Sequence, residues 1–136
     1  MKLKTDNIFQ ITELEVSCSK VYKALMDEKS HSLFTGMAAK IDGVVGGEFE
    51  VMDGTARGYF LNLSKDKRIV QAWTHNQFDP GIFTIVSIDL EKTEKGTRIN
   101  FNHIGVPEDS SGWLTENWKK VYWNRLKEFL EEKVLH

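Results

Sequence analysis

The sequence has 136 residues, of which 40% are hydrophobic and 28% are charged. This length fits one globular domain, residues 1–136, and gives no room for a second core. Eighteen lysines and arginines against twenty aspartates and glutamates give a net charge of -2, which offers phosphate backbones no overall attraction. We therefore expect no nucleic acid among its partners.

The cellular compartment of the protein can be inferred from its single cysteine, Cys18, and from the first residues of the chain. A secreted domain more often carries an even set of cysteines. The first residues contain no apolar signal core, and no stretch of the chain is apolar for long enough to span a bilayer. We expect a cytoplasmic protein without a membrane partner, and a monomer.

The first elements are a strand and two short helices. Residues 9–16 alternate between apolar and polar, but the phase slips between Ile11 and Leu14, which predicts a bulged strand. Ser17 or Ser19 is suited to cap the first helix. Asp27 is suited to cap the second, which we expect to end at Gly36.

The middle of the chain predicts strands joined by tight turns. The period-two segments are Glu48–Met52, Ala56–Leu63, Arg68–Thr74, Ile82–Leu90 and Thr97–His103, with a weak strand at Ala39–Asp42. The connections carry turn residues and are short enough for hairpins. We expect an antiparallel sheet of about seven strands that must curve.

The last predicted element is a long amphipathic helix from Leu114 to Leu135, with Asp109 or Ser111 as its cap. Its apolar face contains Leu114, Trp118, Val121, Tyr122, Leu126 and Phe129. Such a helix needs a sheet to cover. The fold class is therefore α+β, with a curved antiparallel sheet, two short helices, and the long C-terminal helix across its concave side.

The concave side of the sheet is expected to be lined by Phe49, Val51, Tyr59, Leu61, Ile82, Val86, Ile88, Ile99 and Phe101. Aromatic rings opposite Trp118 and Tyr122 make a large apolar chamber possible. The same pattern also predicts a solid core, because an apolar stripe at element spacing is first a packing signal.

Two polar residues fall among these apolar positions. Arg125 lies on the apolar side of the helix, where a guanidinium needs a carboxylate, an aromatic ring, a route to water or an anionic ligand. His103 shares a face with Ile99 and Phe101, so it either orients a polar ligand or forms a structural hydrogen bond.

Catalytic and metal-binding patterns are not found. His31, His75, His103 and His136 lack paired ligand spacing, and there is no Cys/His cluster, so no metal is predicted. The glycine-rich segment 43–47 lacks the lysine of a phosphate-binding loop and precedes a strand. We predict no cofactor and no catalytic residues.

Several motifs, in order along nearly the whole chain, resemble one family. They are residues 34–36 (FTG), 46–49 (GGEF), 53–54 (DG), Gly58, 67–73 (KRIVQAW), 96–97 (GT), 103–107 (HIGVP) and 118–127 (WKKVYWNRLK). Together they resemble the C-terminal domain of activators of the heat-shock protein 90 ATPase, within the START-like helix-grip superfamily. The resemblance implies a helix-grip fold with a cavity between the sheet and the long helix.

Three functions follow from these patterns. Our main prediction is a non-enzymatic domain that binds a small hydrophobic or amphipathic ligand through Phe49, Tyr59, Phe101, His103, Trp118, Tyr122 and Arg125. The resemblance also implies a co-chaperone that binds heat-shock protein 90 and stimulates its ATPase, although eukaryotic activators carry a further N-terminal domain. A third alternative is a cyclase or hydratase in the same cavity, for which His103 is the only titratable candidate.

Overall fold

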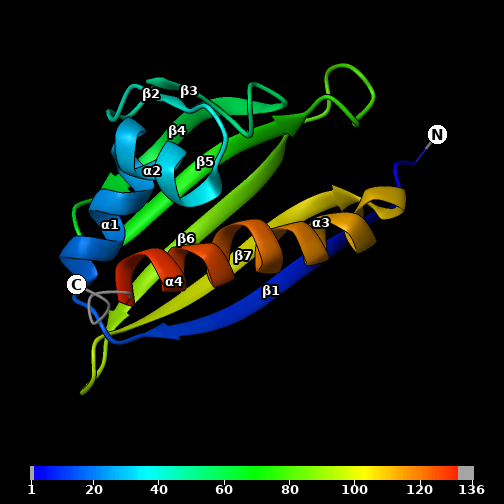
Figure 1. Cartoon of the computed structure of the whole chain (residues 1–136). Helices are drawn as coiled ribbons and strands as arrows, with labels where there is room; N and C mark the ends of the chain where they lie inside the picture. Colours follow the sequence, from blue (N-terminus) through cyan, green and yellow to red (C-terminus); the bar gives the residue numbers. More distant parts are fainter. Residues whose placement is uncertain (1, 132–136) are drawn as a thin grey trace.

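The computed structural model describes residues 2–131 as one antiparallel sheet covered on one face by helices (Figure 1). The elements are β1 (Thr5–Leu14), α1 (Cys18–Met26), α2 (Glu28–Thr35), β2 (Lys40–Ile41), β3 (Glu48–Val51), β4 (Ala56–Ser64), β5 (Arg68–His75), β6 (Thr84–Lys92), β7 (Thr97–Pro107), a 3-10 turn (Glu108–Ser110), α3 (Ser111–Asn117), a π-helical segment (Trp118–Trp123) and α4 (Asn124–Glu131). None of the helices within residues 2–131 has the length and apolar content needed to cross a bilayer.

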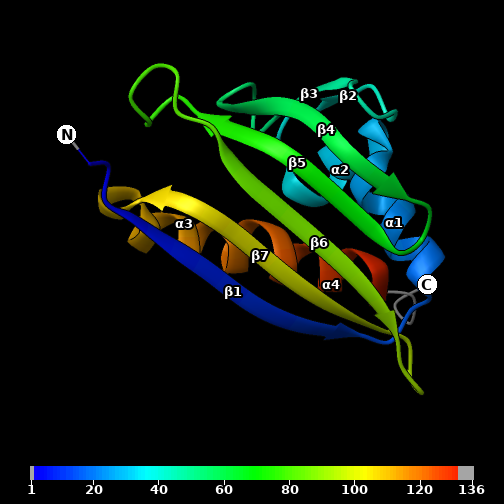
Figure 2. The same cartoon turned by 180° about the vertical axis from the view of Figure 1, so that it is seen from behind.

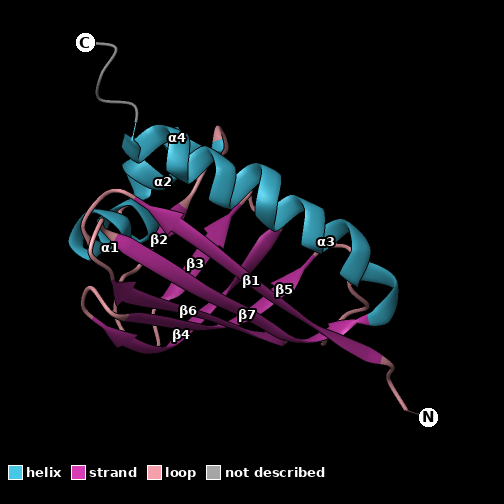
Figure 3. Cartoon of the chain, turned by 90° about the horizontal axis from the view of Figure 1, so that it is seen from below, coloured by secondary structure: helices cyan, strands magenta, loops and turns pink. Residues whose placement is uncertain are grey.

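The seven strands lie in the order β1-β7-β6-β5-β4-β3-β2, and every neighbouring pair is antiparallel. The hairpins run from β2 to β7, and β1 pairs with β7. Helix α3, the π-helical segment and α4 form one continuous helix across the concave face, and α1 and α2 cover one end of it (Figure 3). This arrangement confirms the predicted α+β helix-grip fold.

The two short helices begin and end at the predicted residues. The Ser17 side chain accepts a hydrogen bond from the Lys20 amide, and the Asp27 carboxylate accepts one from the Ser30 amide. Gly36 ends α2 at a φ of 74°, a left-handed conformation that a residue without a Cβ adopts without strain. These caps confirm the local sequence prediction.

The bulge predicted between Ile11 and Leu14 is wrong. From Ile8 to Leu14 the pairing with β7 is regular, and the irregularity lies between Asp6 and Ile8. Phe9 and Ile11 point to the outer face, where they are 59% and 53% exposed. The apparent phase slip thus reflects apolar residues on both faces of the strand rather than an extra residue.

Strand β4 turns toward the core the face that the sequence predicts to be exposed. Tyr59 and Leu61 are 44% and 39% exposed, whereas Phe60 is 1% exposed. Three consecutive apolar residues fit either phase of a strand, and here the Phe60 ring packs at 5.3 Å from the Phe49 ring. The prediction that Tyr59 and Leu61 line the concave side is therefore wrong.

The C-terminal helix departs from α-helical spacing in its middle. The π-helical segment adds a residue to the turn, so the apolar face shifts to Trp123 and Leu126, both at most 2% exposed. Phe129, which regular spacing places inside, is 39% exposed.

The start of this helix also differs from the prediction. The helix begins at Ser111, but no side chain caps its first turn. Ser111 Oγ instead donates to Asp6 Oδ2, 2.8 Å away in β1. The predicted helix residues 132–135 lie outside the described part of the chain.

Gly58 offers a test of how closely the sheet is packed. A Cβ atom at this position would lie 1.8 Å from the Ala72 carbonyl oxygen and 3.1 Å from Phe49 Cζ. Replacing Gly58 with alanine should lower the free energy of unfolding by at least about 2 kcal/mol, because the neighbouring backbone must shift. Urea unfolding followed by circular dichroism measures the change.

Gly112 provides the matched control. It lies in α3, and a Cβ atom there meets nothing within 4 Å. Gly112→Ala should leave stability unchanged or raise it by about 0.5–1 kcal/mol. Equal stability of the Gly58→Ala and Gly112→Ala variants would contradict the close approach of β4 to β5.

Candidate functional site

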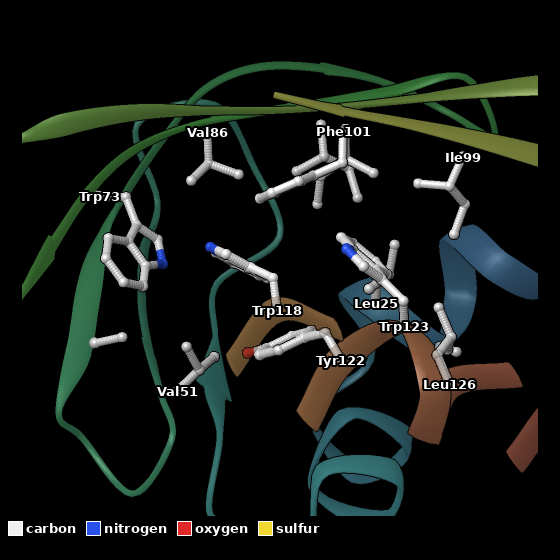
Figure 4. Packing of buried hydrophobic residues seen from close by; sticks show 14 of the residues in the cluster. Leu25, Val51, Trp73, Val86, Ile99, Phe101, Trp118, Tyr122, Trp123 and Leu126 are labelled. Carbon is white, nitrogen blue, oxygen red and sulfur yellow. The ribbon is translucent and has the colours of Figure 1, made fainter. Parts of the chain in front are cut away.

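The hollow between the sheet and the C-terminal helix is filled by aromatic rings (Figure 4). Phe101 from β7 and Tyr122 from the helix lie 4.5 and 4.7 Å, centroid to centroid, from the Trp118 ring. Trp123 stacks on Trp118 at 5.9 Å with an interplanar angle of 16°. Trp73 of β5 closes the other side of Trp118 at 5.8 Å. Such offset and tilted contacts are the geometry that aromatic pairs favour.

Little space remains inside this packing. A void of about 20 Å³ lies beside Trp118 and Tyr122, bounded by Leu25, Met26, His31, Val51, Ile69, Gln71, Trp73 and Ile88. One water molecule needs about 10–15 Å³ measured in this way, whereas small-molecule sites usually offer about 300–1,000 Å³. The large chamber that the resemblance implied is therefore closed by side chains here.

His103 ties the helix to the sheet through hydrogen bonds. Trp118 Nε1 lies 3.1 Å from His103 Nδ1, and an indole N–H can only donate, so Nδ1 accepts. His103 Nε2 then carries the proton and donates to Thr84 Oγ1 at 2.7 Å. Thr84 Oγ1 donates in turn to the Trp73 carbonyl at 2.8 Å. The imidazole is thus neutral, and both of its nitrogens are engaged.

Burial determines the charge state of this imidazole. The His103 side chain is fully buried, and desolvation lowers its pKa from 6.5 to about 3. A general acid or base needs a titratable atom within reach of substrate, and His103 offers neither a free nitrogen nor an opening. The geometry of His103 therefore does not support the catalytic role considered from the sequence.

His31 makes a second buried link, between α2 and the C-terminal helix. Its Nδ1 donates to the Leu25 carbonyl at 2.9 Å, and its Nε2 accepts from the Tyr122 hydroxyl at 2.8 Å. Burial lowers the His31 pKa and raises the Tyr122 pKa, so both groups stay neutral. The hydroxyl of Tyr122, one of the predicted ligand-binding residues, already has a protein partner.

Arg125 lies outside the hollow. Its side chain is exposed on the helix edge, and Nη1 donates to the Thr35 carbonyl at 2.5 Å. This contact puts a positive charge at the C-terminal end of α2, where the helix dipole is negative. The guanidinium thus makes a structural hydrogen bond at the edge of the helix, because the π-helical segment turns position 125 away from the core.

The predicted site residues divide into two groups. Phe49, Phe101, His103, Trp118 and Tyr122 are at most 3% exposed and belong to the core. Tyr59 faces outward and Arg125 lies at the edge. Sequence reasoning missed Trp73, Trp123, Thr84 and His31. Trp73 and Thr84 share the phase of their buried strand neighbours, which was a readable signal, whereas Trp123 depends on the π-helical segment.

The interior offers no free polar group to a ligand. Every buried side-chain nitrogen and oxygen in the described residues has a hydrogen-bond partner. Within residues 2–131, no group of His, Cys, Asp and Glu side chains has the geometry to hold a metal ion. This core is therefore built for packing, and binding in it requires side chains to move.

This layered arrangement defines a class of proteins, the helix-grip domains. The family model described as "Activator of Hsp90 ATPase homolog 1-like protein" matches residues 15–131. The chain belongs to this family.

Curated relatives support the assignment. The human protein "Activator of 90 kDa heat shock protein ATPase homolog 1" is 22% identical over 128 residues. The match covers 94% of this chain but only 38% of the human protein. The Dictyostelium discoideum homologue is 25% identical over 116 residues, and the match covers 85% of this chain and 30% of that protein. The chain thus spans well under half the length of these relatives.

Solved structures share the fold. An HSP90 activator from Plasmodium falciparum superposes with a TM-score of 0.80 at 18% identity, covering 93% of this chain and 96% of that one. The Aha1 dimer from Colwellia psychrerythraea gives 0.81 at 24% identity, with the same coverage. At these identities the likeness establishes the fold alone.

The buried histidines predict how stability depends on pH. Between pH 6.5 and about 3 the unfolded chain binds a proton at position 103 that the folded chain does not, so stability falls as the pH falls through this window. The loss of stability due to His103 should reach about 2 kcal/mol by pH 5. The lowered pKa of His31 adds a further loss of stability in the same direction. Urea unfolding at pH 7 and pH 5 measures the difference.

The variant His103→Asn separates this contribution. Its amide keeps one donor and one acceptor but does not titrate, so it should be less stable at pH 7 yet lose less stability between pH 7 and pH 5. His75→Asn is the control, since His75 also has a lowered pKa but lies at the edge of the core. An identical pH 7-to-5 loss in wild type and His103→Asn would disprove the neutral buried imidazole.

Proposed function

We propose that this chain is a non-enzymatic protein-binding domain that contacts an Hsp90-type chaperone and stimulates its ATPase. The observation that carries the proposal is the family match over residues 15–131. The filled hollow adds support, because a void of about 20 Å³ directs binding toward the surface rather than the interior. We place the protein in the cytoplasm, where the free thiol of Cys18 stays reduced.

Purified components test this proposal. Adding the chain to the Hsp90 chaperone of the same organism should raise the ATPase rate in a saturable way, and titration calorimetry should detect binding. The Gly58→Ala variant, which carries a disturbed sheet, should stimulate less than Gly112→Ala. Absence of both binding and stimulation would contradict the proposal. Binding without stimulation would support the contact with the chaperone but not the effect on its ATPase.

A second candidate function is binding of a small apolar molecule, and the position of the void favours it. Trp118 and Tyr122, two of the residues expected to bind a ligand, line this void. The half-buried Met26 and Gln71 side chains also bound it. A thioether side chain adapts its shape easily, so displacement of Met26 would enlarge the space without unfolding the sheet.

Native mass spectrometry of freshly purified protein tests this candidate. A bound molecule should add mass to the wild type and be missing from Trp118→Ala, which should also lose about 3–5 kcal/mol of stability. A wild-type protein that carries only its own mass, before and after exposure to apolar compounds, would rule out the second candidate.

A further inference from the structure

The outer face of the sheet carries an open groove beside two exposed aromatic rings. No helix within the described residues covers this face (Figure 2). The groove, which we call the outer groove, has a volume of about 350 Å³, and its walls include Glu48 and Glu50 of β3, Tyr59 of β4, and Phe83 just before β6. Small-molecule sites usually offer about 300–1,000 Å³, so the outer groove is large enough for a small ligand.

The strand register brings the two aromatic rings together. Tyr59 lies opposite Ala72 of β5, and Ala72 lies opposite Ile85 of β6. Phe83 precedes Ile85 by two residues and therefore lies on the same face. The small side chain of Ala72 lets the Tyr59 and Phe83 rings approach to 6.5 Å, with their planes tilted by 55°. Both rings remain exposed, and the negative face of an exposed ring attracts cations.

Glu48 adds a negative charge beside this aromatic wall. It lies directly opposite Tyr59 in the β3–β4 pair, so the two side chains are neighbours on one face. On its other side the Asp42 amide donates to the Glu48 carbonyl at 2.9 Å, which makes a second carboxylate its neighbour. No ion pair within residues 2–131 includes Glu48 or Asp42. This end of the outer groove is therefore negatively charged.

The positive charges of this region lie around Glu50 instead. In the strand register Glu50 lies between Lys40 of β2 and Arg57 of β4. The Arg57 guanidinium has a partner of its own, because Nη1 donates to Asn76 Oδ1 at 2.6 Å, just after the end of β5. A cationic ligand is thus drawn to Glu48 and Tyr59 rather than to Glu50.

The side chains of the outer groove favour one kind of cation. Among residues 2–131, no group of three or more His, Cys, Asp and Glu side chains has the geometry to hold a metal ion. Aromatic rings instead bind organic cations such as quaternary ammonium groups, whose methyl groups contact the ring faces. One carboxylate beside two rings therefore fits a methylated ammonium group better than a metal ion.

We propose that the outer groove binds a small molecule that carries a methylated ammonium group. The cationic group lies against the Tyr59 and Phe83 rings and faces the Glu48 carboxylate. Because the groove is open to water and salt, its dissociation constant should be about 1–10 mM at low ionic strength. This proposal does not depend on the proposed chaperone contact.

Choline and the alcohol in which a carbon atom replaces the choline nitrogen test the proposal. The two molecules have nearly the same shape, but only choline is charged. In an NMR titration at low ionic strength, choline should shift the amide signals of Glu48, Tyr59 and Phe83 in a saturable way, whereas the alcohol should not. Sodium chloride at the same concentration controls for ionic strength. Added salt should weaken the binding of choline, because it screens the carboxylate.

Two variants with matched controls locate the site. Glu48→Gln removes the charge with little change in shape and should raise the dissociation constant for choline about two- to fivefold. Glu128→Gln, at an exposed position of α4, should bind choline like the wild type. Tyr59→Leu removes a ring and should also raise the constant about two- to fivefold. Phe9→Leu removes a ring that is 59% exposed on β1 and should have no effect.

Circular dichroism should show the wild-type fold for all four variants, since each changes an exposed side chain. If Tyr59→Leu does not fold, Phe83→Leu removes the other ring. Equal shifts from choline and from the alcohol would overturn the proposal, as would the absence of any saturable shift. An affinity for choline that Glu48→Gln or Tyr59→Leu leaves unchanged, or that the control variants lower equally, would also overturn it.

Discussion

The structure depends on the hydrogen-bond chain that runs from the Trp118 indole through His103 and Thr84 to the Trp73 carbonyl. A buried donor or acceptor without a partner costs about 1–3 kcal/mol, so these hydrogen bonds fix the helix at one height and rotation over the sheet. The rings of Phe101, Tyr122 and Trp123 then pack around Trp118. The same contacts keep His103 neutral and leave almost no free volume.

This closed interior changes where function is to be sought. A hydrophobic ligand would have to displace rings that already contact one another, whereas binding at the surface leaves the core intact. The proposed contact with a chaperone would use the surface, where the outer face of the sheet exposes several apolar side chains.

Much of the fold could be predicted from the sequence because its signals are local. Ser17, Asp27 and Gly36 cap the short helices through contacts within a few residues, and the hairpin turns follow from their own residues. The motifs spread along the chain identified the helix-grip arrangement because their order, rather than any single one, was informative.

The errors arose where packing chose between local alternatives. The run of Tyr59, Phe60 and Leu61 fits either face of a strand, and only the Phe49 ring selects Phe60. The π-helical segment changes the spacing of buried positions along the helix, so regular spacing placed Arg125 and Phe129 inside and missed Trp123. No sequence pattern shows that His103 would find Trp118 and Thr84 rather than a ligand.

Nitrogen NMR of the His103 imidazole tests the central claim most directly. The two ring nitrogens have different chemical shifts when one is protonated and the other accepts a hydrogen bond. We expect a protonated Nε2 and an unprotonated Nδ1 at neutral pH, with no change until the pH approaches about 3 or the protein unfolds. An imidazole that titrates near pH 6.5 in the folded protein, or that carries its proton on Nδ1, would contradict it.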